Sequence, residues 1–238
     1  MAKTVCSSLL NMDAAVIADQ IDRDGAVEIP NVIGNGDVDA ACRVLARASD
    51  AGDGGYVFFE GTTGLEGTFL ADLPTCPAVL SLATRLCQEM SGTSSGDLHA
   101  RQTVRVLRGE TGQRESLRFH YDSFILTMII PIAMPKSGPM GDLIMLPNHR
   151  PIRQSYALNV LDKVRYANPI AQYGLKSRHA KGALKCIRMI PGHAYLFSGY
   201  RTLHANDICA EDALRCTAVL HFNNPHTHHP LKRFLSGH

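Results

Sequence analysis

Two short stretches of the chain hold the side chains with the most distinctive chemistry. His120 and Asp122 form a His-x-Asp pair, His204 opens the segment HANDICAEDALRCT, and Arg215 follows His204 by 11 residues. Two neutral imidazoles and one carboxylate on a single triangular face are the ligand set of facial non-haem Fe(II) sites, which keep three coordination positions open. His120, Asp122 and His204 can supply that face.

The spacing of these residues fits extended strands. Alternate side chains of a strand point the same way, so His120 and Asp122 can reach one ion together. The same alternation in LRCTAVLHF places Arg215 and Thr217 on one face. A planar guanidinium beside a hydroxyl is suited to binding a carboxylate. This second strand therefore predicts a carboxylate-binding site.

The combination resembles the Fe(II)/2-oxoglutarate-dependent oxygenase superfamily. Its pattern is His-x-Asp/Glu, a distal His, and an Arg about ten residues later, often in an Arg-x-Ser/Thr pair. Here the pattern reads His120-Tyr121-Asp122, His204 and Arg215-Cys216-Thr217, within a part that runs from about residue 118 to residue 217. The resemblance implies that the triad holds iron, which 2-oxoglutarate chelates through one carboxylate and its keto oxygen. It also implies that Arg215 and Thr217 bind the far carboxylate.

The resemblance implies a dioxygenase reaction that uses Fe(II), 2-oxoglutarate and O2. Oxidative decarboxylation to succinate and CO2 would accompany oxidation of an unactivated C–H bond, with hydroxylation as the default outcome. A small molecule such as an amino acid or a biosynthetic intermediate is the expected substrate. Two alternatives are a cupin-like metal enzyme that does not use 2-oxoglutarate and a non-catalytic binding module on the same fold. The intact triad together with Arg215 argues against both.

Three further side chains are candidates for the site. Arg118 has the same parity as His120, so it could point toward the site and meet an anionic substrate group, with a surface ion pair as the alternative. Arg105 is a second candidate for binding a substrate carboxylate. The hydroxyl of Thr127 could help hold 2-oxoglutarate, but its parity is opposite to that of His120. A bulge or bend would be needed to aim Thr127 inward.

The composition is that of an ordinary globular protein. The 238 residues are enough for one domain, 45% are hydrophobic and 19% are charged. A net charge of +2 gives no reason to expect nucleic acid or an anionic membrane as a partner. The seven cysteines are scattered, odd in number and lack a Cys-x-x-Cys pair, which favours free thiols in a reducing cytoplasm. The longest mostly apolar run, 124–133, is too short to span a bilayer and predicts a buried strand.

The pattern along the chain predicts a mainly β protein with flanking helices. Helical spacing of apolar residues occurs at 12–22, 38–48, 78–90 and 155–167, and strand-like segments at 26–30, 56–60, 101–109, 116–122, 123–135, 142–147, 184–190, 193–199 and 214–222. We expect a double-stranded β-helix, a cupin-like jelly roll, as a single domain over 1–238. It would have a helical N-terminal buttress at about 1–97 and a jelly-roll core at about 98–225.

Two segments stand apart from this pattern. Residues 171–183 are polar, basic and contain glycine, which predicts either a mobile loop that covers the substrate or a solvated surface loop. The tail contains His226, His228 and His229 without an acidic or Cys partner. A solvated tail is therefore expected there, and a metal site is not.

Overall fold

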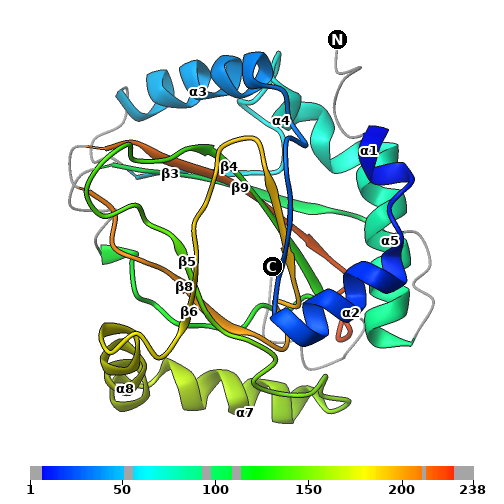
Figure 1. Ribbon diagram of the computed structural model, residues 1–238, viewed down its shortest axis with the longest axis vertical. Helices are drawn as coiled ribbons and strands as arrows, with labels where there is room; N and C mark the ends of the chain where they lie inside the picture. Colours follow the sequence, from blue (N-terminus) through cyan, green and yellow to red (C-terminus); the bar gives the residue numbers. More distant parts are fainter. Residues whose placement is uncertain (1–6, 51–55, 93–97, 109–113, 211–212, 228–238) are drawn as a thin grey trace.

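Two antiparallel sheets form the centre of the computed structural model, which describes residues 7–50, 56–92, 98–108, 114–210 and 213–227 (Figure 1). The larger sheet has the strand order β1-β7-β4-β9-β3-β2, and the smaller sheet has the order β6-β5-β8. The larger sheet comprises β1 (Val27–Ile29), β2 (Tyr56–Glu60), β3 (Arg101–Leu107), β4 (Leu126–Ala133), β7 (Ala194–Phe197) and β9 (Arg215–Phe222). The smaller one comprises β5 (Leu143–Leu146), β6 (Lys185–Ile187) and β8 (Leu203–Asn206).

The two sheets pack face to face. Ile129 on β4 and Phe197 on β7 share one buried apolar cluster with Leu143 and Met145 on β5. On β9, every second residue from Cys216 to Phe222 belongs to a different cluster on the other side of the larger sheet. Because side chains alternate along a strand, the remaining β9 residues point between the sheets. These inward-facing residues are Arg215, Thr217, Val219 and His221.

Helices from the N-terminal part cover the outer face of the larger sheet. Apolar side chains of α2 (Ala14–Asp24), α3 (Asn35–Asp50) and α5 (Pro77–Ser91) join the outer residues of β3, β4, β7 and β9 in one core. Shorter elements, α1 (Ser7–Leu10), α4 (Phe69–Asp72) and the 3-10 turn η1 (Leu73–Thr75), complete this layer. The predicted helices at 12–22, 38–48 and 78–90 are confirmed. Asp13 caps α2 at its start, and Gly25 ends it with a left-handed φ of 84°.

A helical hairpin covers the smaller sheet. It consists of α7 (Tyr156–Ala167) and α8 (Pro169–Ala180), which lie below the smaller sheet in Figure 1. Leu175 of α8 packs with Ile144 and Leu203 from the outer face of that sheet. The predicted loop at 171–183 is therefore wrong for most of its length. The side chain of Asn168 accepts a hydrogen bond from the Ala171 amide, and Pro169 occupies the first turn, so the dipeptide that ends α7 also starts α8.

The expected strand over 116–122 is also wrong in its extent. Leu117 has a left-handed φ of 54°, which interrupts an extended chain just before the His-x-Asp pair. Only His120 forms a β-bridge there, with His204 of β8. Residues 123–125 then bend before β4 begins. The tail prediction fails at His226, which is buried beside the hydroxyl of Tyr200, while His228 and His229 lie outside the described residues.

No helix within the described ranges has both the length and the apolar character needed to cross a membrane.

Candidate metal centre and anion site

The structure brings His120, Asp122 and His204 together. One possible ligand atom from each lies within 4.8 Å of the others. Nε2 of His120 is 3.7 Å from Oδ1 of Asp122, and Nε2 of His204 is 3.6 Å from Oδ2 of the same carboxylate. Asp122 and His204 are buried, whereas about half of the His120 side chain is exposed, at 48%. One side of the cluster is therefore open to solvent.

Backbone hydrogen bonds hold the two halves of this cluster in register. The amide of His120 donates to the carbonyl of His204 at 2.9 Å, and the amide of His204 donates back to His120 at 3.0 Å. The amide of Asp122 donates to the carbonyl of Gly199 at 3.0 Å. The cluster is thus placed by direct pairing of two segments that lie far apart in the sequence.

Hydrogen bonds to the rings fix which nitrogen of each histidine can bind a metal. Nδ1 of His120 is 3.0 Å from the carbonyl of Arg118, and Nδ1 of His204 is 3.0 Å from the carbonyl of Thr202. A carbonyl only accepts, so each Nδ1 carries the hydrogen and each Nε2 keeps its lone pair. Burial lowers the pKa of His204 to about 4. That ring is therefore neutral near pH 7, as a metal ligand must be.

Asp122 is the negative centre of the cluster. Burial alone would raise its pKa, but His204, His221 and His120 outweigh that effect and hold the pKa well below its usual value. The hydroxyl of Thr127 donates to Oδ2 at 2.6 Å, and Nε2 of His221 lies 3.4 Å from the same oxygen. A charge-assisted hydrogen bond of this kind orients a metal-binding carboxylate.

The position of Thr127 differs in detail from the sequence prediction. A bend was required to aim its hydroxyl inward, and the bend at 123–125 supplies it. Thr127 pairs with His221 across β4 and β9, and both side chains reach Asp122. The hydroxyl contacts the triad carboxylate itself, so the structure gives it a hydrogen-bonding partner that spacing alone did not predict.

Two residues near the cluster were missed from the sequence. His221 shares the inward face of β9 with Arg215 and Thr217, so strand alternation could have singled it out. Gly199 had no such signal, because its role depends on a close approach between distant segments. A Cβ atom added at Gly199 would lie 2.1 Å from Oδ2 of Asp122 and 2.2 Å from Oγ1 of Thr127. Only glycine leaves room for the carboxylate and its hydroxyl donor.

Arg215 lies deep between the sheets with part of its guanidinium unsatisfied. Its residue is only 1% exposed; Nε donates to the carbonyl of Gly141 at 2.8 Å, and Nη2 donates to Oδ1 of Asn206 at 2.9 Å. Nη1 is buried and has no hydrogen-bond partner among the described residues. Burial lowers the pKa of Arg215 to about 10. A buried cation without an acidic partner is costly unless an anion joins it.

Arg105 lies beside this cation. It pairs with Thr217 across β3 and β9, and its positive charge adds to the lowering of the Arg215 pKa. Nε of Arg105 is buried and likewise has no partner in the described part of the chain. Thr217 is buried, lies opposite Arg105 across the two strands, and shares the inward face of β9 with Arg215. The arrangement can bind at least one carboxylate.

Arg118 lies elsewhere. Its Nη1 pairs with Oε1 of Glu115 at 3.0 Å, and its side chain is 68% exposed. The structure therefore shows the surface ion pair that was the alternative interpretation of this residue. A role in substrate binding remains only a prediction.

Comparisons with known proteins connect this geometry to a fold. No protein-family model matches the sequence, and no curated protein gives a significant match. Among solved structures, AviO1 from Streptomyces viridochromogenes Tue57 is similar, with a TM-score of 0.59 and 14% identity over 90% of this chain and 96% of that one. A prolyl hydroxylase from Trichoplax adhaerens, solved with a hypoxia-inducible-factor peptide, has a TM-score of 0.56 and 14% identity, covering 94% and 93% of the two chains.

A third similar structure is SnoK, a non-haem α-ketoglutarate-dependent carbocyclase from nogalamycin biosynthesis. It has a TM-score of 0.55 and 14% identity, covering 90% of this chain and 86% of that one. At this level of identity the likeness establishes the fold. The chain has the double-stranded β-helix that the sequence predicted, with two antiparallel sheets and flanking helices.

Proposed function

We propose that this chain is an Fe(II)- and 2-oxoglutarate-dependent dioxygenase that oxidises, most simply by hydroxylation, an unactivated C–H bond of a small molecule. The observation that carries the proposal is the pairing of a His-Asp-His cluster with a buried arginine whose Nη1 has no partner within the described residues. The first group suits a metal and the second suits a carboxylate. The similarity in fold to α-ketoglutarate-dependent enzymes supports the same assignment.

The residues present fit an iron ion and its co-substrate. Nε2 of His120, Nε2 of His204 and a carboxylate oxygen of Asp122 would hold the metal. Nη1 of Arg215 and the hydroxyl of Thr217 would bind the far carboxylate of 2-oxoglutarate. When bound, the metal would supply activation of O2 coupled to decarboxylation of 2-oxoglutarate. The protein's own part is to keep the His204 imidazole neutral, hold Asp122 ionised and orient the anion.

The substrate would approach from the side on which His120 is exposed. Arg105, the second cation of the anion site, would bind a carboxylate of the substrate. Proteins with this fold include a prolyl hydroxylase solved with a peptide, a carbocyclase and an epimerase. The fold therefore leaves the outcome of the oxidation open, and we propose hydroxylation because it needs no step beyond oxidation of the C–H bond.

Binding of 2-oxoglutarate by the Co(II)-loaded protein tests the proposal. Isothermal titration calorimetry should show saturable binding to the wild type and at least a tenfold loss of affinity in Arg215→Met. The matched control is Arg101→Met, because Arg101 lies on β3 and forms an exposed ion pair with Glu60. Equal 2-oxoglutarate affinity in wild type and Arg215→Met would favour a metal enzyme that does not use this co-substrate.

A further inference from the structure

Arg150 is buried, and its guanidinium lies over two aromatic rings. Its guanidinium carbon lies 4.0 Å from the ring centroid of Tyr121 and 4.4 Å from that of Tyr200. Tyr121 separates His120 from Asp122, and Tyr200 follows Gly199, whose carbonyl binds the Asp122 amide. The guanidinium lies over both rings and therefore contacts the two segments that carry the cluster.

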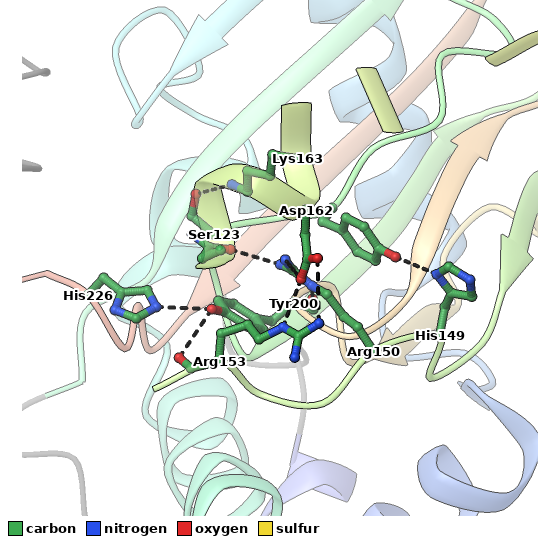
Figure 2. Close-up of polar contacts among 10 residues, drawn as sticks. Ser123, His149, Arg150, Arg153, Asp162, Lys163, Tyr200 and His226 are labelled. Carbon is green, nitrogen blue, oxygen red and sulfur yellow. Dashed lines mark hydrogen bonds and ion pairs between the residues drawn. The ribbon is translucent and has the colours of Figure 1, made fainter. Parts of the chain in front are cut away.

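Every nitrogen of the Arg150 guanidinium has a partner. Nε donates to the carbonyl of Tyr200 at 2.7 Å, Nη2 donates to Oδ1 of Asn159 at 2.9 Å, and Nη1 lies 3.2 Å from Oδ2 of Asp162. Figure 2 shows this group of polar contacts around Arg150, Asp162 and Tyr200. Asn159 and Asp162 come from α7, so one side chain joins that helix to both segments of the candidate metal centre.

Other polar contacts tie the helical hairpin to the same stretch of chain. Nζ of Lys163 donates to Oγ of Ser123 at 2.6 Å, and Ser123 directly follows Asp122 in the sequence (Figure 2). The side chain of Gln172 on α8 accepts from the amide of Phe119 at 3.0 Å and donates to its carbonyl at 2.8 Å. The hairpin therefore binds the chain at Phe119, just before the His-x-Asp pair, and at Ser123, just after it. Arg150 contacts Tyr121, which lies between these two points in the sequence.

We propose that Arg150 is a positioning residue for the metal ligands. It holds the rings of Tyr121 and Tyr200 against its guanidinium, and through them it fixes the backbone of His120, Asp122 and Gly199. The inference rests on the proposed function only in that the cluster binds a divalent metal. Arginine suits the task because its planar, permanently charged fork stacks and donates at once, whereas no other side chain does both.

Co(II) titration of the full-length protein tests this inference. The probe is Co(II) alone, followed by its visible ligand-field spectrum, in wild type, Arg150→Met and Asn159→Ala. Loss of an outer-shell partner typically weakens metal binding by roughly 10- to 100-fold. For Arg150→Met we expect Co(II) affinity to fall within that range and the spectrum to change. For Asn159→Ala we expect a smaller loss of affinity, because the Arg150 guanidinium stays in place and loses only one hydrogen-bond acceptor.

The matched control is Arg153→Met. Arg153 shares Asp162 with Arg150, at 2.8 Å from Nε to Oδ2, but its guanidinium is not stacked on Tyr121 or Tyr200. Its Co(II) affinity and spectrum should match those of wild type. Wild-type affinity and spectrum in a folded Arg150→Met protein would overturn the positioning role, and if that variant does not fold, wild-type behaviour of Asn159→Ala would do so. A wild type that binds no Co(II) would instead sink the proposed function.

Discussion

The hydroxyl of Thr127 donates a 2.6 Å hydrogen bond to Oδ2 of Asp122, the carboxylate that faces both histidines of the cluster. This bond joins β4 of the larger sheet to the segment that pairs with β8 of the smaller sheet. The candidate metal centre is therefore held by both sheets. Side chains that hydrogen-bond to the Asp122 carboxylate and fix its orientation should therefore affect metal affinity.

Thr127→Val should weaken metal binding. The substitution keeps the shape of the side chain but removes the donor from a buried carboxylate, so Co(II) affinity should fall roughly 10- to 100-fold. The free energy of unfolding should fall by about 1–3 kcal/mol. Calorimetric Co(II) titration and urea denaturation measure the two effects. Thr84→Val is the control, because its hydroxyl donates to the Leu80 carbonyl within α5 and should leave Co(II) affinity unchanged.

Gly199→Ala should disrupt the centre more severely. The added Cβ would lie 2.1 Å from Oδ2 of Asp122, so the carboxylate must leave its present position beside the histidines. We expect Co(II) binding to fall below detection in the titration while far-UV circular dichroism shows a folded protein. Gly174→Ala is the control, because a Cβ there meets nothing within 4 Å. Full Co(II) affinity in Gly199→Ala would refute the close approach between Gly199 and Asp122.

Arg215→Met should separate stability from co-substrate binding. Arg215 is a buried cation with no acidic partner among the described residues, so replacing it with an apolar side chain of similar length should change stability by no more than about 1 kcal/mol. The rise in melting temperature caused by 2-oxoglutarate should disappear in the variant. Differential scanning calorimetry with and without 2-oxoglutarate measures both. A rise equal to that of wild type would show that Arg215 does not bind the co-substrate.

The stability of the metal-free protein should depend on the protonation of His204. Burial lowers its pKa from 6.5 to about 4, so between these values the unfolded chain binds more protons than the folded one. The free energy of unfolding therefore rises with pH across this window, by an amount on the order of 3 kcal/mol at most. The low pKa of Asp122 acts in the same sense at still lower pH.

Urea denaturation at pH 7.5 and pH 5, with a chelator present, measures this dependence. Wild type should be clearly less stable at pH 5, and His204→Asn should lose less stability between the two pH values because it lacks the titrating ring. An identical pH dependence in both proteins would contradict a buried, neutral His204.

The residues of the candidate centre could be predicted from the sequence because they occur at characteristic spacings along the chain. His120 and Asp122 are close in the chain, and Arg215 and Thr217 lie on a regular strand where alternation holds. Alternation failed between His120 and Thr127, because the bend at 123–125 breaks the relation between their directions. The left-handed conformation of Leu117 could not be predicted from the sequence, because leucine rarely adopts a positive φ.

The hairpin and its buried network were beyond prediction for a different reason. Asn168 and Pro169 indicated the end of one helix, and the same two residues cap and begin the next. In the sequence Arg150 looks like any polar loop residue. Its burial could not be predicted, because its partners come from α7, Tyr121 and Tyr200, which lie in other parts of the chain. His226 is buried for a similar reason, through its contact with the hydroxyl of Tyr200. Contacts between distant segments decide such burial.

The most direct test of the proposed function is an anaerobic titration of the metal-free protein with Fe(II) and 2-oxoglutarate, followed by visible absorption. The proposed function predicts a weak charge-transfer band in wild type that is lost in Asp122→Ala and weakened in Arg215→Ala. The first variant removes a ligand and the second removes the cation for the far carboxylate. A folded wild type that binds iron and gives no band on adding 2-oxoglutarate would contradict the assignment.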